Sequence, residues 1–289
     1  MSAHILPPPP AARPVTVPFD TEDPEGFARL LDKVTAERGF RCGSYKERCL
    51  RRRIAVRMRA KGVHTFDDYA RVLDVDAHEF DRLLDALTIN VTKLFRNWEA
   101  WASLAAQAVP RLWQESRGAV RVWSAGTASG EESYSLAALL HRHADSLGET
   151  ARLDGSLVLG TDVDRACLAA AARGTFAEPS FADTPPALRE RYFPGPAPAS
   201  AGPELRALVA FEQRDLLLDP APAGPWHLIV CRNVLIYFDR DTQEALFERF
   251  HDALAPGGVL FLGKVETLFG PARQRFTAVD QRERIFRRH

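Results

Sequence analysis

The sequence predicts an α/β fold, in which a doubly wound parallel sheet follows an all-helical N-terminal domain. From residue 119 onward, short apolar runs alternate with helical patterns, as expected for parallel strands joined by crossover helices. A small-residue turn joins the first of these runs to its helix, an arrangement typical of nucleotide-binding sheets. Residues 24–118, in contrast, carry apolar side chains at helical spacing, with a break at residues 89–97.

Composition limits the classes of partner and compartment. The chain has 289 residues, of which 46% are hydrophobic and 26% charged, and its formal net charge is zero. These values indicate a soluble globular protein with no overall attraction to nucleic acid or membranes. Because no apolar run could span a bilayer, we expect no direct membrane insertion. The four cysteines have no metal-ligand spacing, so we expect no metal site and free thiols in the cytoplasm.

The helical part divides at turn and capping signals. Residues 1–20 are rich in proline and predict a disordered tail, with a partner-binding motif as the alternative. A helical domain is expected over residues 21–88 and a linker with a lid helix over residues 89–118. Within these ranges we expect five helices. The first starts at Pro24, the second covers Tyr45–Lys61 with Ser44 as its cap, and the third follows a Thr65 cap. The fourth covers His78–Thr88 and the fifth Trp98–Glu115.

Residues 119–289 form the expected sheet domain. Strands are predicted at 120–124, 156–161, 208–213, 227–232 and 258–263, and helices at 131–147, 164–172 and 240–255. Pro256-Gly257-Gly258 is expected to end the last helix. A terminal hairpin is expected from Phe276–Val279 and Arg284–Phe286. A proline-rich stretch interrupts the alternation and predicts an insertion at about 175–212.

The glycine turn after the first strand is the first candidate binding element. Its residues 124–130 are small, and Glu131 and Glu132 open the helix that follows. Backbone amides at a helix start face a ligand, but two glutamates disfavour a phosphate. The turn is not G-x-G-x-x-G, so we do not expect a dinucleotide. An ordinary strand-to-helix turn is the alternative interpretation.

Polar residues follow three other strands of the predicted sheet. Asp162 is placed to accept hydrogen bonds from ribose hydroxyls, while Asp164 is expected to cap a helix. Asp215 is a candidate acceptor for an adenine amino group, or a turn aspartate. Arg232-Asn233 come directly after an apolar strand, where a ligand of the sheet lies. Tyr237 is spaced to face the same crevice, with a core tyrosine as the alternative.

The segment between the two parts of the chain carries polar residues in an apolar frame. Asn90, Thr92 and Arg96 accompany Leu94 and Phe95, which a solvated linker would not need. We therefore predict a lid over the pocket, with Arg96 offering a bidentate guanidinium to a carboxylate.

The second helix is strongly basic. Its cations include Arg48, Arg52 and Arg59, and Glu47 is the acidic residue expected to face them. Leu50 and Met58 belong to the stripe that we expect to be buried, which leaves the arginines on the solvent side. An excess of one sign indicates an acidic partner. Aromatic residues do not interleave the arginines, so nucleic acid is not the expected partner.

Several segments in order resemble the chemotaxis receptor methyltransferase (CheR) family. They are TINVTKLFR, VWSAGTASGEESYSLA, GTDVDRACLAAAARGTF, FEQRDLL, LIVCRNVLIYF and LAPGGVLFLGKVE. The resemblance implies a class I methyltransferase domain with a small inserted β-subdomain, and transfer of a methyl group from S-adenosylmethionine to glutamates of a chemoreceptor-like protein. It implies that an acidic helical receptor segment meets Arg48, Arg52 and Arg59. The implied cofactor contacts are Asn90, Thr92, Arg96, Glu131 (or Glu132), Asp162, Asp215, Leu216, Arg232 and Asn233.

The sequence departs from the family pattern at several positions. Thr127-Ala128-Ser129 stand where the family has Cys-Ser-Thr, Lys264-Val265 replace the His-Ser of its G-H-S-E, and Leu94 replaces the first phenylalanine of its F-F-R. Carboxylate methylation needs no general base, so we expect Arg96 and Tyr237 to act by holding a carboxylate and lining the methyl channel. The alternatives are a non-catalytic S-adenosylmethionine sensor, a nucleic-acid methyltransferase and a small-molecule carboxyl methyltransferase.

Overall fold

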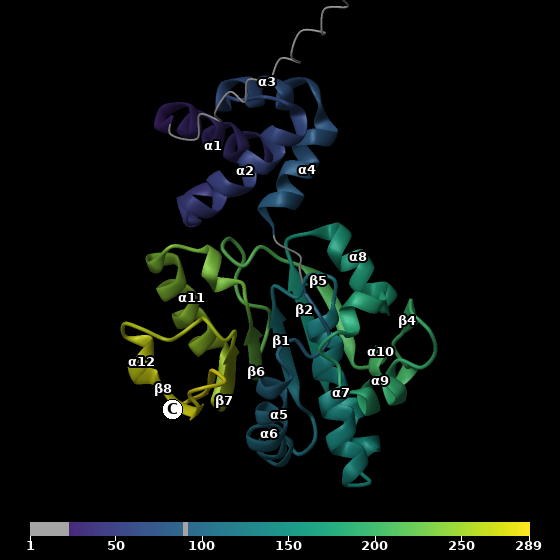
Figure 1. The fold of residues 1–289 in the computed structure, drawn as a ribbon. Coiled ribbons are helices and arrows are strands. Elements are labelled where there is room, and N and C mark those ends of the chain that lie inside the picture. Colours follow the sequence, from purple (N-terminus) through teal and green to yellow (C-terminus); the bar gives the residue numbers. More distant parts are fainter. Residues whose placement is uncertain (1–22, 89–91) are drawn as a thin grey trace, which may run out of the picture. The chain divides into compact units, whose positions relative to one another are not determined.

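The computed structural model describes residues 23–88 and 92–289 (Figure 1). The predicted proline-rich tail and Asn90 lie outside these residues. The chain divides into two compact units. Of the described residues, one unit comprises residues 23–42 and Glu47–Leu87, and the other comprises Gly43–Lys46, Thr88 and residues 92–289.

The helical unit is built from α1 (Pro24–Arg38), α2 (Glu47–Lys61), α3 (Phe66–Val75) and α4 (Ala77–Leu87). Each helix buries one apolar stripe, as amphipathic spacing requires. Thr65 caps α3 as predicted, because its side chain accepts a hydrogen bond from the Asp68 N–H.

The predicted Ser44 cap is wrong. Ser44 ends a short 3-10 helix, η1 (Cys42–Ser44), and α2 begins only at Glu47. The residues between them run alongside a later segment: Tyr45 forms an isolated β-bridge with Phe238, and the Ser44 carbonyl accepts from the Asp239 N–H (3.1 Å). These long-range hydrogen bonds hold the main chain extended where the local sequence favoured a helix.

The sheet of the second unit has seven strands in the order β5-β2-β1-β6-β7-β9-β8. Neighbouring strands are parallel from β5 to β7, and β9 is antiparallel to both β7 and β8. The predicted strand and hairpin positions are confirmed within a few residues at their ends. The strands are β1 (Arg121–Ala125), β2 (Leu157–Asp162), β5 (Val209–Gln213), β6 (Trp226–Cys231), β7 (Leu254–Leu262), β8 (Phe276–Asp280) and β9 (Ile285–Arg288).

Helices cover both faces of this sheet (Figure 1). Alternate residues of β1 point to opposite faces, so Val122 packs in one core and Trp123 in the other. The Val122 core contains side chains of α5 (Trp98–Gln107), α6 (Val109–Glu115) and α7 (Glu131–Ser146). The Trp123 core contains side chains of α11 (Arg240–Ala253) and α12 (Ala272–Arg275). The helix that follows β2 is α8 (Arg165–Arg173), and η2 (Thr150–Gly155) and η4 (Leu235–Tyr237) are short 3-10 turns.

Two expectations that involve proline need correction. The predicted helix Trp98–Glu115 is two helices, α5 and α6, with Pro110 in the first turn of the second. Proline has no N–H to continue a helix and fits only its first turn, so the chain breaks there. Pro256-Gly257-Gly258 do not end helix α11, because α11 already ends at Ala253 and these residues lie within β7, which starts at Leu254. They lie where the pairing of β6 with β7 shifts register.

The insertion contains little β-structure. A two-stranded antiparallel pair, β3 (Thr175–Phe176) and β4 (Ala199–Ser200), accompanies η3 (Glu178–Phe181), α9 (Pro186–Tyr192) and α10 (Pro203–Arg206). Because Val209–Gln213 form edge strand β5 of the main sheet, the insertion ends before residue 209, earlier than the predicted 212. Buried aromatic side chains, among them Phe176, Phe181 and Phe193, fix the insertion to the rest of this unit.

Across residues 23–88 and 92–289, no helix combines the length and apolar character that a membrane span requires. The same residues contain no group of three or more histidine, cysteine or acidic side chains that could hold a metal ion. Among the described residues, the four cysteines form no disulfide with one another.

Candidate active site

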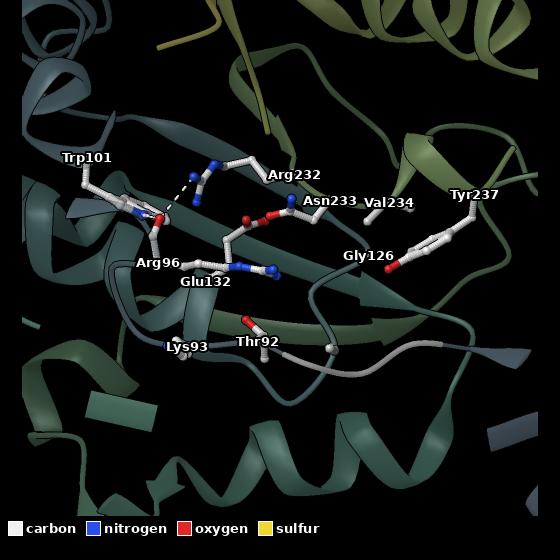
Figure 2. A pocket seen from close by; sticks show the side chains of 11 residues that line it. Thr92, Lys93, Arg96, Trp101, Gly126, Glu132, Arg232, Asn233, Val234 and Tyr237 are labelled. Atoms are coloured by element: carbon white, nitrogen blue, oxygen red, sulfur yellow. Dashed lines mark hydrogen bonds between the residues drawn. The ribbon is translucent and has the colours of Figure 1, made fainter. Parts of the chain in front are cut away.

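A pocket lies at the carboxyl ends of β1 and β6 (Figure 2). Within the sheet, β1 has β2 as its neighbour on one side and β6 on the other. The pocket is therefore at the switch point of the strand order, where sheets of this type bind ligands. Of the residues predicted for the site, the wall contains Thr92, Arg96, Arg232, Asn233 and Tyr237. The other wall residues are Lys93, Trp101, Gly126, Ala128, Glu132 and Val234.

The glycine turn forms one side of this pocket. Gly126 has φ +82°, and a Cβ added there would meet Cγ2 of Val234 at 2.6 Å. The N–H groups of Gly126 and Thr127 both donate to the Thr161 carbonyl, at 2.9 and 3.0 Å. The turn is therefore folded tightly across the ends of β1 and β2, and only glycine combines that conformation with that close approach.

Asp162 ties this turn to the end of β2. Its Oδ2 accepts a hydrogen bond from the Ala128 N–H (2.8 Å) and its Oδ1 accepts from the Asp164 N–H (3.1 Å). Burial raises the pKa of Asp162, and these backbone hydrogen bonds oppose the rise. Each carboxylate oxygen keeps a second lone pair with which it can accept from a ligand. Asp164 caps α8 as predicted, since it accepts from the N–H groups of Ala166 and Cys167.

Arg232 is buried beneath the pocket, with 6% of its surface exposed. Its Nη2 donates to the main-chain carbonyl of Arg96 (3.0 Å), and its guanidinium lies over the rings of Trp101 and Phe261, 5.2 and 4.7 Å from their centroids. Trp101 Nε1 donates to the same Arg96 carbonyl (2.9 Å). Nε of Arg232 has no hydrogen-bond partner among the described residues. Two buried groups thus fix the main chain at Arg96, whose side chain extends into the pocket (Figure 2).

The wall contains Glu132 and not Glu131, which is the glutamate assigned from the sequence resemblance. Glu132 is buried and accepts from the Ser124 hydroxyl (2.8 Å). Desolvation raises its pKa to about 7, although the charges of Arg232 and Arg96 oppose that rise. The Glu131 carboxylate instead accepts from the hydroxyls of Ser129 and Ser180, at 2.7 and 3.0 Å.

Glu266 supports the site, and the sequence analysis missed it. Its Oε2 accepts from the N–H groups of Asn233 (3.0 Å) and Gly263 (2.6 Å). These bonds hold Asn233 at φ +61°, a conformation that non-glycine residues rarely adopt. The signal available in the sequence was an acidic residue four positions after a buried strand. Lys264 and Val265, which depart from the family pattern, are exposed.

Four of the predicted cofactor residues that the structure describes are not in the pocket wall: Glu131, Asp162, Asp215 and Leu216. Asp215 accepts from the Leu217 N–H (2.7 Å), and its own N–H donates to Asp219 (2.8 Å), which is the arrangement of a turn aspartate. The Leu216 carbonyl accepts from Arg249. The roles of Asp215 and Leu216 toward the cofactor stay predictions.

The basic helix α2 divides into paired and exposed cations. Arg57 donates to the buried Glu79 through Nε (2.9 Å) and Nη2 (2.6 Å), and Lys61 pairs with Asp76 (2.8 Å). Arg53 is buried and donates to the Leu87 carbonyl. The expectation that the cations of this helix face only Glu47 is therefore wrong. Arg48, Arg52 and Arg59, the residues predicted to meet an acceptor, are exposed.

Two family profiles together match almost all of the described chain. The profile described as "CheR methyltransferase, SAM binding domain" matches residues 90–285, and "CheR methyltransferase, all-alpha domain" matches residues 25–88. A "Chemotaxis protein methyltransferase" of Listeria innocua is 38% identical over 247 residues, which cover 85% of this chain and 90% of that protein. Proteins of the same name from Klebsiella aerogenes and Escherichia coli are 35% and 32% identical, over 83% and 88% of this chain and 82% and 88% of theirs.

The residues at the pocket suit S-adenosylmethionine. This cofactor carries a carboxylate, an ammonium group and ribose hydroxyls, and the pocket offers a guanidinium from Arg96 and a carboxylate from Glu132. The glycine turn leaves room for the cofactor to approach the backbone, and Asp162 keeps free lone pairs at the end of β2. The chain has the class I methyltransferase fold, uses S-adenosylmethionine as its cofactor and belongs to the CheR methyltransferase family.

Proposed function

We propose that this methyltransferase acts in the cytoplasm on glutamate side chains of a chemoreceptor-like protein, as part of chemotaxis. One observation carries the acceptor class: the pocket wall presents the Arg96 guanidinium, while its described residues include no histidine or cysteine. A guanidinium binds a carboxylate through paired hydrogen bonds. The names of the relatives, which are chemotaxis protein methyltransferases, support the same acceptor.

The chemistry of a carboxylate acceptor agrees with these residues. Glutamate has a reference pKa of about 4.3, so it is ionised at neutral pH and needs no general base. When bound, S-adenosylmethionine supplies a methyl group activated by a positively charged sulfur. The protein then has to align a carboxylate and strip its water. We assign the first task to Arg96 and give Tyr237, together with Trp101, the second.

Helix α2 supports a protein acceptor. Arg57 and Lys61 pair with Glu79 and Asp76, whereas Arg48, Arg52 and Arg59 are exposed on the surface of the helix. These exposed arginines would attract and align an acidic helical segment of the receptor. Attraction of this kind acts on association and weakens with salt. Nucleic acid is the less favoured partner, since the chain carries no net positive charge.

The test is methyl transfer from S-adenosylmethionine labelled in its methyl group to a membrane fraction that contains chemoreceptors. We expect label in the receptor band. Mild alkali should release this label, because a glutamyl methyl ester hydrolyses in alkaline solution. Replacement of the receptor's methylated glutamates by alanine should abolish the label. Label that resists alkali, or that appears in added nucleic acid, would refute the proposal.

A further inference from the structure

The insertion contacts the pocket segment Thr92–Asn97 through Ser180–Thr184, a short loop formed by the end of η3 and the turn that follows it. The Ser180 carbonyl accepts from the Leu94 N–H (2.9 Å), and the Thr184 hydroxyl donates to the Leu94 carbonyl (3.4 Å). Asp183 makes two further contacts: Oδ2 accepts from the Asn97 N–H (2.9 Å) and Oδ1 lies 3.3 Å from Lys93 Nζ. Arg96 stands between the residues that this loop holds.

The main chain on both sides of Arg96 is in an unfavourable conformation. Phe95 has φ +52° and Asn97 has φ +60°, and neither is glycine. Such residues persist only where the surrounding structure fixes them, and they cluster at functional sites. Here the Phe95 N–H donates to Ser135 Oγ (2.8 Å), and the Asn97 N–H donates to Asp183. Each strained residue is therefore held by one side chain from another element.

Asp183 is well suited to hold the Asn97 N–H because the accepting group is a charged carboxylate. A hydrogen bond from an amide to a carboxylate is stronger than one to a neutral acceptor. That bond from Asn97 is the main reason that the pKa of Asp183 lies below its ordinary value, and the charges of Lys93 and Arg96 act in the same direction. Asp183 is in the insertion, whereas Arg96 lines the pocket and lies two residues before the start of α5.

We propose that Asp183 is a positioning residue that sets the Arg96 guanidinium in the pocket by holding the left-handed turn at Asn97. It makes no contact with the pocket itself, since it is not among the wall residues. The inserted subdomain thereby contributes to cofactor affinity through the main chain of Phe95–Asn97. This inference rests on Arg96 binding the carboxylate of the cofactor, in addition to the acceptor carboxylate assigned to it above.

The test compares three variants by calorimetric titration with S-adenosylhomocysteine, the demethylated cofactor, which requires no acceptor. Asp183→Ala should weaken binding about tenfold. Asp183→Asn keeps an oxygen for the Asn97 N–H and should weaken binding only about threefold. Glu178→Ala is the matched control, because Glu178 lies in the same insertion and pairs with Arg189 (2.6 Å) away from the pocket. It should bind within twofold of the unchanged protein.

A double-mutant cycle separates positioning from general damage. If Asp183 acts through Arg96, then Asp183→Ala should add less than twofold when Arg96 is already alanine. An equal loss in both backgrounds, or unchanged affinity of Asp183→Ala alone, would overturn the inference. Should Asp183→Ala fail to fold, the same cycle with Asp183→Asn decides, with its threefold effect expected to vanish beside Arg96→Ala. Normal affinity of Arg96→Ala would remove the premise and identify the Arg96 assignment as the error.

Discussion

Arg232 donates a hydrogen bond to the main-chain carbonyl of Arg96, although 136 residues separate them. The bond joins the end of β6 to the segment that precedes α5 and uses no atom of the Arg96 side chain. The two arginines therefore have different tasks. Arg232, buried among Trp101 and Phe261, supports the backbone, while Arg96 presents its guanidinium to the pocket.

The first prediction uses this separation of tasks. Arg96→Ala should reduce cofactor binding or turnover by about 2–4 kcal/mol, because a buried carboxylate loses its charged partner. The carbonyl that Arg232 and Trp101 hold is retained, so thermal stability should change little. Steady-state kinetics and calorimetry measure the effect. Arg111→Ala, which removes an exposed pair with Glu115, is the control and should be normal. Unaltered kinetics of Arg96→Ala would exclude the assigned role.

The second prediction concerns Asp162. Asp162→Ala should weaken S-adenosylhomocysteine at least tenfold, or about 1.4 kcal/mol, because the ribose loses an acceptor and the Ala128 N–H loses its partner. Asp164→Ala is a matched control two residues away. It removes a helix cap worth about 1 kcal/mol of stability and should leave affinity within twofold. Equal affinities for the two variants would remove Asp162 from the site.

The third prediction is a pH dependence of stability caused by Glu132. Its pKa in the folded protein is about 7, above the reference value of about 4.3 for an exposed glutamate. The folded state therefore holds a proton that the unfolded state has lost, and stability falls as pH rises between these values. The loss should amount to about 3 kcal/mol. Urea unfolding of the cofactor-free protein at pH 5 and pH 8 should show it.

Glu132→Gln isolates this contribution, because glutamine keeps an acceptor for Ser124 and does not titrate. The variant should gain stability relative to the unchanged protein as the pH is raised from 5 to 8. A stability difference that is the same at both pH values would show that Glu132 is ionised throughout this range.

The fourth prediction tests the exposed arginines of α2. The double variant Arg52→Glu, Arg59→Glu should abolish methylation of a protein acceptor and leave cofactor affinity within about twofold. Stability should change by only about 0.5 kcal/mol per site, because both residues are exposed. Arg71→Glu with Arg82→Glu, on α3 and α4, places the same charge change elsewhere on the helical unit and should keep its activity. Methylation that survives the first pair would mean that α2 is only a solvated surface.

Local patterns predicted the sheet well because each strand is a short apolar run bounded by turn residues. They also placed Arg232, Asn233 and Tyr237 in one site, since residues after parallel strands meet at one edge, and the predicted lid segment placed Thr92 and Arg96 in the same site. Where they failed, the deciding contacts lie far apart in sequence. Ser44 resembles a helix cap, but its carbonyl accepts from Asp239, 195 positions later.

Charge was the hardest property to predict. All cations of the basic helix were expected on the solvent side, because the partners of Arg57 and Lys61 are on α4 and in the turn before it, far along the chain. Glu266 was missed because its carboxylate binds main-chain N–H groups, so its position after a buried strand was the only signal and no partner residue type accompanied it. The choice between Glu131 and Glu132 depends on which side of the first turn of α7 faces the pocket, and adjacent residues on a helix point about 100° apart.

Because Gly43–Lys46 pair with the segment around Tyr237, the sheet unit is built from two separate stretches of the chain. The Lys46 N–H donates to the Tyr237 carbonyl (2.8 Å), and Lys46 Nζ donates to the Ile236 carbonyl (2.9 Å). The polypeptide enters the sheet unit at residue 43, leaves it after residue 46 and returns at residue 88. A fragment that begins at residue 88 would therefore lack four residues of its own fold, and the carbonyl of a pocket residue would lose its donor. The catalytic half of this enzyme cannot be excised by a single cut.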